Sequence, residues 1–299
     1  MGRLAAWHTP PMSTDGAREA ETAAGPDERG TTPAKAIERA RVRAPTRGNR
    51  RLEALLDGVN ADAELLGWWH MAQVTSERLG MSDHSWVHVQ IVLNIGLRLL
   101  RLLAKAGVEP AMVTDHGMGR RDGEVVVAAG ALLHDVGMSI HRTDHEAYSL
   151  FLAEPKLRQL LEGVYDEPER TVVVSEALQT IIGHRRRGEQ PYTLEAGVVR
   201  VADALDMAQG RSRVPVESGR IGIHALSAAA IDEVEIEAGT VRAVSVEIKM
   251  NNSAGVFQVD DLLATKLRGT PLESHLEVVA TIEGETEKRL LTEFRLPES

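Results

Sequence analysis

The sequence predicts a mainly α-helical protein, an all-helical bundle followed by a small α+β domain with the element order β-β-α-β-β. Between residues 51 and 214, apolar residues recur with the 3.6-residue period of helices. After about residue 215, short segments alternate apolar and charged residues, as half-exposed strands do. Aromatic residues are only 3% of the 299 residues, so Leu, Val, Ile and Ala are expected to form the core.

The first 50 residues are expected to be a disordered leader. They are rich in Ala, Arg, Thr, Gly and Pro, and Pro10-Pro11 and Pro33 would interrupt a helix that began there. The expected limits are 1–50 for the leader, 51–214 for the helical domain and 215–299 for the α+β domain.

Capping residues, glycine and proline divide the helical region. Ser82 or Asp83 is expected to cap the helix that begins at His84, and Gly107 is expected to end it. Pro155 is expected to separate two helices. The expected helices begin near Arg51 and then run from Asn60 to Leu79, His84 to Ala106, Glu124 to Leu133, Asp144 through Leu152, Pro155 to Gly163, Thr171 to His184, and Thr193 to Met207.

The α+β region is expected to contain four strands and one helix. The strands are expected at Val234–Glu237, Val244–Ile248, Leu276–Ile282 and Leu290–Phe294, the last two joined at Gly284, and the helix at Asp260–Leu267. The polar segment 251–255 either caps the following helix or reaches the cleft of the helical domain. The domain itself could mediate dimerisation, cover that cleft as a lid or bind a partner.

Composition excludes several functional classes. The chain has no cysteine, so disulfides, thiolate metal sites and Cys nucleophiles are absent. The net charge of −10 disfavours a large nucleic-acid interface. No apolar run is expected to reach the roughly 18–20 residues that cross a bilayer, and the N-terminus lacks the pattern of a signal peptide. We therefore expect a cytoplasmic protein without membrane contact.

The candidate functional residues centre on His134-Asp135, which ends the apolar run 131–133. Burying an imidazole and a carboxylate is costly unless a partner such as a metal ion is present. Both groups bind Mn, Fe, Zn or Mg. Alone, the pair is more typical of a helix-end aspartate beside a satisfied histidine than of a metal site. Four other residues favour a metal site, because each lies on or at the end of a different expected helix: His88, His145, His184 and Asp203.

This order of residues resembles the HD superfamily of metal-dependent phosphohydrolases over about residues 80–213, and within it the HD domain of ribonuclease Y. The α+β domain is not part of the resemblance. The matching motifs are His134-Asp135-Val136-Gly137, Asp144-His145-Glu146, Ile181-Ile182-Gly183-His184, Ala202-Asp203-Ala204-Leu205 and Gly210-Arg211-Ser212-Arg213.

The resemblance implies an all-helical fold that holds one or two divalent ions (Mn, Fe, Mg or Zn). The residues that match the first site are His88, His134, Asp135 and Asp203. His145 and His184 match positions that hold a second ion. Ribonuclease Y has two adjacent histidines at the latter position, whereas this chain has His184-Arg185, which leaves the second ion or its substrate contact open.

The resemblance also implies hydrolysis of a phosphomonoester or phosphodiester, of nucleotide type, by a metal-activated water. The expected catalytic residues are Asp135, His145, His184, Arg142 and Arg211. Arginine suits the phosphoryl oxygens because its planar fork matches phosphate geometry, and Arg185 and Arg213 are further candidates. Asp206 either orients a ligand or is a solvated turn residue.

Two other functions are compatible with these residues. The same six ligands could hold the di-iron centre of an HD-type oxygenase, which iron content and oxygen consumption would reveal. A non-catalytic metal- and nucleotide-binding module would instead bind nucleotide tightly without turnover. The expected partner is a small phosphorylated substrate of nucleotide type, and a homodimer is left open.

Overall fold

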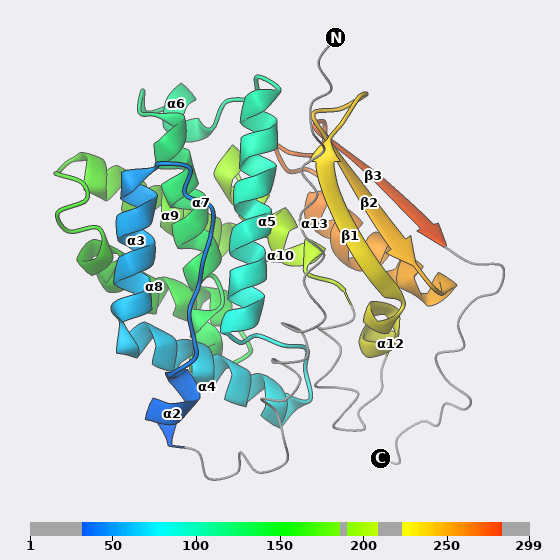
Figure 1. The fold of residues 1–299 in the computed structure, drawn as a ribbon, viewed down its shortest axis with the longest axis horizontal. Helices are drawn as coiled ribbons and strands as arrows, with labels where there is room; N and C mark the ends of the chain where they lie inside the picture. The colour runs from blue at the N-terminus through cyan, green and yellow to red at the C-terminus, as the bar shows by residue number, and fades with distance from the viewer. Residues whose placement is uncertain (1–31, 186–189, 209–222, 283–299) are drawn as a thin grey trace. The chain divides into compact units, whose positions relative to one another are not determined.

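The computed structural model describes residues 32–185, 190–208 and 223–282. The chain divides into two units, Met1–Arg39 and Ala40–Ser299. In the first unit the described part contains helix α2 (Pro33–Ile37). The second unit holds a mainly helical region and a small sheet, which confirms the predicted fold class (Figure 1).

Most of the expected leader lies outside the described residues, but its last eleven residues, 40–50, belong to the second unit. Val42 is buried, and the Asn60 side chain accepts a hydrogen bond from its amide and donates one to its carbonyl, both at 2.9 Å. The compact unit thus extends upstream of residue 51. The expected boundary at residues 214 and 215 lies outside the described residues.

Helix α7 lies at the centre of the helical region and contacts α3, α5, α9 and α10. It is buried along nearly its whole length because Val, Ala, Gly and Leu dominate its sequence. Gly130 permits the approach of α9, since a Cβ there would overlap the Thr180 hydroxyl. The helical elements are α3 (Arg50–Ala61), α4 (Ala63–Leu79), α5 (Trp86–Lys105), α6 (Ala111–Thr114), α7 (Arg120–Leu133), η1 (Val136–Ser139), α8 (His145–Leu160), α9 (Glu169–Gly183) and α10 (Leu194–Leu205).

Several predicted helix limits were wrong; helix α7, for example, begins at Arg120 rather than Glu124. Ser85, rather than Ser82 or Asp83, caps α5, and its hydroxyl accepts a hydrogen bond from the Val87 amide at 3.1 Å. Helix α8 also continues through Pro155 instead of ending there. Buried Ala153 and Leu157 lie on either side of this proline, and their packing outweighs the lost backbone hydrogen bond.

Helix α5 has the length and apolar composition to cross a membrane, contrary to the expectation that no segment would. Half of this stretch is buried in the protein, and the helix packs against α7 and α10. Core helices of globular proteins have the same composition, so this feature is weak evidence for a membrane span.

The α+β region begins with α12 (Ile223–Ala229) and contains one three-stranded sheet among the described residues. Its strands are β1 (Ile231–Ala238), β2 (Val244–Met250) and β3 (Leu276–Ile282). Strand β2 is central, antiparallel to β1 and parallel to β3. Its apolar side chains at alternate positions are buried, as its sequence pattern predicts. The predicted strand Leu290–Phe294 lies outside the described residues.

The connection between β2 and β3 holds a short 3-10 turn, η3 (Ser253–Gly255), and a π-helical segment, η4 (Gln258–Ala264), that continues into α13 (Thr265–Leu267). The Asn252 side chain accepts a hydrogen bond from the Ala254 amide at 2.8 Å and so caps η3, a turn within the 251–255 segment rather than the following helix.

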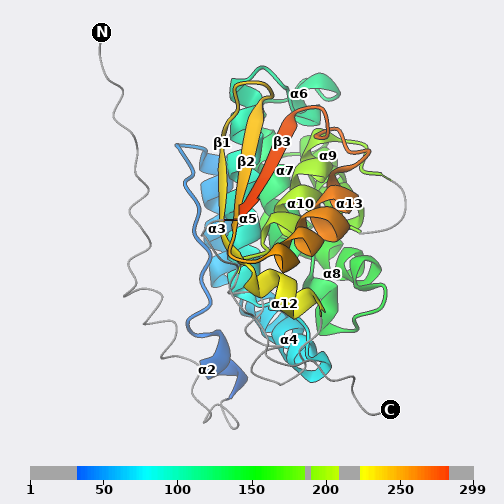
Figure 2. The ribbon, with the colours of Figure 1, turned by 90° about the vertical axis from the view of Figure 1, so that its right-hand side faces the viewer.

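The connecting segment packs against helix α10 through η4 and α13 (Figures 1 and 2). Gly197 on α10 permits close packing with the following loop, because a Cβ there would meet the Leu272 side chain at 2.8 Å. Strands β1 and β2 contact α5. The α+β region therefore adjoins the two helices that carry His88 and Asp203.

Candidate metal centre

The six predicted metal ligands come together in the structure, and all lie in the first or last turn of a helix or directly beside one. Five of them are buried, and the Asp203 side chain is 11% exposed. Their places are His88 in the first turn of α5, His134 after α7, Asp135 before η1, His145 at the start of α8, His184 after α9 and Asp203 in the last turn of α10.

The Asp135 carboxylate lies between two pairs of histidines. Its Oδ1 is 3.1 Å from His145 Nε2 and 3.6 Å from His184 Nε2. Its Oδ2 is 3.3 Å from His134 Nε2 and 3.5 Å from His88 Nε2. Each oxygen thus faces one pair, which is the arrangement of a carboxylate that bridges two cations.

Two donor groups share this carboxylate. The His88 group consists of His88, His134 and Asp135, and the His145 group consists of Asp135, His145 and His184. The donor atoms within each group lie within 4.8 Å of one another. Asp203 joins the His88 group, because its Oδ1 is 3.4 Å from His88 Nε2 and 4.0 Å from His134 Nε2.

Hydrogen bonds at Nδ1 orient the imidazole rings. His134 Nδ1 lies 2.8 Å from the Ala131 carbonyl, and His184 Nδ1 lies 2.5 Å from the Ile181 carbonyl. Because a carbonyl only accepts, both Nδ1 atoms must carry the proton and donate it. Each ring therefore directs its Nε2 lone pair into the centre, as metal-binding histidines do.

His88 Nδ1 lies 2.6 Å from Asp206 Oδ2. Because an ionised carboxylate also only accepts, this Nδ1 carries the proton and donates it. His145 differs because its Nδ1 has two neighbours on Arg142, the carbonyl at 3.1 Å and the guanidinium at 2.8 Å. A carbonyl only accepts and a guanidinium only donates, so this ring can direct its lone pair to either side.

The facing Nε2 atoms test whether a metal ion fits. They lie 3.2 Å apart in His88 and His134, and 3.4 Å apart in His145 and His184. Two lone pairs at such distances repel unless a cation, either a proton or a metal ion, lies between them. The donors are nitrogen and oxygen atoms only, a set that suits Mn, Fe or Zn, so the residues fit a divalent ion.

Electrostatics keep the bridging carboxylate ionised. Burial opposes ionisation of Asp135, but attraction to His134 and hydrogen bonds with the neighbouring histidines outweigh it, so its pKa lies well below the usual range. Burial lowers the pKa of His184. For His145, the hydrogen bond with Asp135 outweighs the effect of burial and raises the pKa. The centre thus holds a permanent negative charge for a cation.

The turn that carries His134 and Asp135 depends on a glycine and a serine. A Cβ at Gly137 would overlap the His145 carbonyl and the Ser149 amide, so only glycine lets η1 pack against the first turn of α8. The Ser149 hydroxyl donates to the His134 carbonyl at 2.6 Å and accepts from the Gly137 amide at 2.9 Å. These contacts fix the ligands of both groups relative to each other.

Sequence reasoning missed three contributors and left one open. His84 is buried, with its Nε2 3.8 Å from Asp135 Oδ2. Ser149 and Lys266, whose ammonium group pairs with Asp203 Oδ2, were not identified at all. For Asp206 the sequence allows either an orienting role or a solvated turn, and its bond to His88 supports the orienting role. No spacing pattern points to Lys266, which is distant in sequence from every motif.

The predicted arginines line one edge of the centre where they are described. Arg142 is exposed beside His145, and Arg185 Nε is 3.7 Å from Glu146 Oε2. Arg211 and Arg213 lie outside the described residues. His141 is exposed. The described arginines therefore accompany the His145 group.

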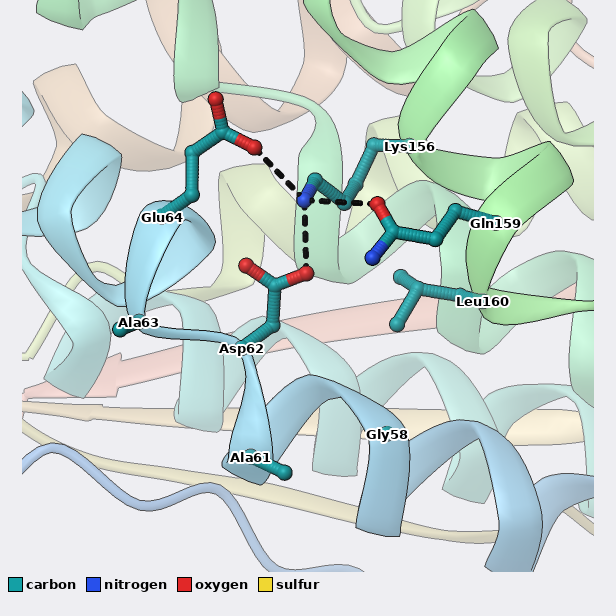
Figure 3. Close-up of a pocket in the computed structure, with 8 residues that line it drawn as sticks. All are labelled: Gly58, Ala61, Asp62, Ala63, Glu64, Lys156, Gln159 and Leu160. Atoms are coloured by element: carbon teal, nitrogen blue, oxygen red, sulfur yellow. Dashed lines mark hydrogen bonds and ion pairs between the residues drawn. The ribbon is translucent and has the colours of Figure 1, made fainter.

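A separate hollow lies between the α3–α4 junction and α8 (Figure 3). Buried Lys156 donates to Asp62 Oδ2 at 2.6 Å and to Gln159 Oε1 at 3.0 Å, and it pairs with Glu64 Oε2 at 2.8 Å. Asp62 also caps α4 by accepting from the Leu65 amide at 2.9 Å. This network joins helices and includes none of the predicted metal ligands.

The fold and the centre define a class of helical protein with a His-Asp metal site. A family model of the HD domain matches residues 83–208. The uncharacterized protein MJ1020 of Methanocaldococcus jannaschii is 37% identical over 208 residues, which cover 70% of this chain and 80% of that protein. No solved structure matches the chain. The chain therefore belongs to the HD family, a family of metal-dependent phosphohydrolases.

Proposed function

We propose that this protein hydrolyses a phosphomonoester or phosphodiester of nucleotide type at a centre of two divalent ions. The observation that carries the proposal is the Asp135 carboxylate, which presents one oxygen to each of two histidine pairs. His88, His134 and Asp203 would complete one site, and His145 and His184 the other. When bound, the ions would lower the pKa of water and polarise the phosphoryl oxygens.

The protein's own groups would prepare the site for that chemistry. Asp135 stays ionised, and the inward Nε2 lone pairs of His134 and His184 need no deprotonation before they bind a cation. Burial excludes bulk water from His88 and His134, which are 0% exposed, and so strengthens the interactions in the centre.

The edge beside the His145 group would receive the phosphate. Arg142 and Arg185 supply two fixed positive charges there, and both have forked guanidinium groups that match phosphate oxygens. Arg185 replaces the second histidine of the ribonuclease Y pattern, so we propose that it contacts substrate rather than metal. The resemblance to that enzyme favours a phosphodiester, and the net charge of −10 favours a small one.

Metal content and turnover test the proposal together. Wild-type protein and Asp135→Ala, purified without tag or chelator, would be compared for metal per chain and then with Mn²⁺ on a panel of nucleotides, dinucleotides and phosphomonoesters. We expect two ions and turnover in the wild type, and loss of both in a folded variant. A fully active Asp135→Ala protein would overturn the proposal, and so would a wild type that binds nucleotide without turnover.

The di-iron alternative is tested by the same preparation. If the bound metal is iron, oxygen consumption with phosphorylated substrates is measured beside phosphate release. Oxygen uptake without hydrolysis would replace the phosphohydrolase assignment with an oxygenase, because both use the same donor atoms.

A further inference from the structure

We propose that Lys266, from the α+β region, is a positioning residue for the metal centre, because it holds Asp203 so that one carboxylate oxygen is directed at His88 and His134. This inference rests on the metal site of the proposed function but on no particular substrate. Lys266 also lies beyond residues 83–208, where the HD family model matches.

The two oxygens of Asp203 have different neighbours. Oδ1 faces His88 Nε2 at 3.4 Å and His134 Nε2 at 4.0 Å, while Oδ2 forms an ion pair with the Lys266 ammonium group. The lysine thus binds the oxygen that faces away from these imidazoles. A carboxylate held at one oxygen cannot rotate freely, so Oδ1 stays directed at His88 and His134.

The ion pair is fixed on both sides. The Lys266 and Asp203 side chains are 12% and 11% exposed, so solvent screens their attraction little. Lys266 belongs to α13, which packs on α10, and close packing at Gly197 and Leu272 holds the same segment against that helix. The ammonium position is therefore set by the folded α+β region rather than by a mobile side chain at the surface.

Asp206 orients the His88 imidazole as Lys266 orients the Asp203 carboxylate. It accepts a hydrogen bond from His88 Nδ1 at 2.6 Å and so directs Nε2 toward the same point that Asp203 Oδ1 faces. Groups behind metal ligands commonly change metal affinity about 10- to 100-fold when they are removed. We expect Lys266 to act with that strength on the His88 group alone.

The test is a titration of the metal-free full chain with Mn²⁺, with free Mn²⁺ followed by electron paramagnetic resonance. We compare wild type with Lys266→Met, which keeps the chain length without a donor, Lys266→Gln, which keeps a donor without charge, and Lys266→Arg. One of two Mn²⁺ sites should weaken about 10- to 100-fold in the Met variant. The Gln variant should weaken it less, and the Arg variant should restore most of the affinity.

Lys249→Met is the matched control, because this β2 lysine also pairs with carboxylates, but those of Glu233 and Glu235, which are not predicted metal ligands. It should bind Mn²⁺ as the wild type does. Circular dichroism checks folding, and if Lys266→Met does not fold, Lys266→Gln decides.

Three results would overturn the inference alone. Two unchanged Mn²⁺ sites in a folded Lys266→Met protein would show that the ion pair is unimportant for metal binding. Tighter binding in that variant would show that the lysine competes with the ion, and equal weakening of both sites would show a general structural effect. A wild type that binds no Mn²⁺ would overturn the two-ion site of the proposed function as well.

Discussion

The two donor groups share Asp135 but have different surroundings. Behind the His88 group lie Asp206 and Lys266, whose side chains are 9% and 12% exposed. Beside the His145 group lie Arg142, Glu146 and Arg185, and the Arg185 side chain is 35% exposed. One group is thus enclosed by residues that hold its ligands, whereas the other meets solvent through charged residues. In the proposed function, the first binds metal firmly and the second also receives substrate.

The largest effect on stability is expected at Gly137, because both donor groups depend on the packing of η1 against α8 at this residue. Gly137→Ala would place a Cβ against the backbone of His145 and Ser149, which cannot move aside as a side-chain end can. We expect a loss of about 3 kcal/mol or more in the free energy of unfolding. Urea denaturation measures it, with Gly67→Ala as control, since a Cβ at that helical position meets nothing within 4 Å. Equal stability of the two variants would contradict the close packing of η1 on α8.

A substitution at Asp206 is expected to affect the His88 group and leave the His145 group unchanged. Asp206→Ala would free the His88 ring and should lower the affinity for one metal ion about 10- to 100-fold, equivalent to about 1.4–2.7 kcal/mol. Asp206→Asn keeps an acceptor for Nδ1 and should weaken it less. Mn²⁺ titration measures both variants. If the weakened site proves to be that of His145 and His184, the division between the groups is wrong.

The positions of most predicted ligands were predictable because apolar helices end in polar residues. His134 and His184 directly follow helices whose periodicity is visible in the sequence, and both were placed correctly. Asp203 was predicted on the right helix for the same reason. A polar residue next to a buried helical run needs a partner, and the apolar run followed by the polar residue can be recognised in the sequence.

The residues that support the ligands, and the course of helix α8, depend on tertiary contacts that leave no local sequence pattern. Ser149 resembles any helical serine until its hydroxyl is seen between the His134 carbonyl and the Gly137 amide. Lys266 is 63 residues from Asp203 and follows a segment that is π-helical in the structure. The predicted helix break at Pro155 was wrong because the packing of α8 outweighs the local tendency of proline to end a helix.

Ser149 offers a smaller test of the shared turn. Ser149→Ala would leave the buried carbonyl of His134 without this donor, at a cost of about 1–3 kcal/mol in stability. Because the carbonyl precedes Asp135, we also expect weaker metal binding in both groups. Ser175→Ala is the control, since that hydroxyl donates at 2.8 Å to the Thr171 carbonyl on the exposed side of α9. A destabilised Ser149→Ala protein with unchanged metal affinity would limit the serine to a structural role.

The smallest effect is expected at the solvent-exposed edge and tests the role assigned to the His145 group. Arg185→Ala would remove a partly exposed charge that also pairs with Glu146, so we expect KM for a phosphorylated substrate to rise about 3- to 10-fold, with metal content unchanged. The control is Arg158→Ala on α8, whose guanidinium pairs with Glu154 at the surface. A fall in metal content instead would mean that Arg185 supports the second ion, and the group that receives substrate would then have to be sought among other residues.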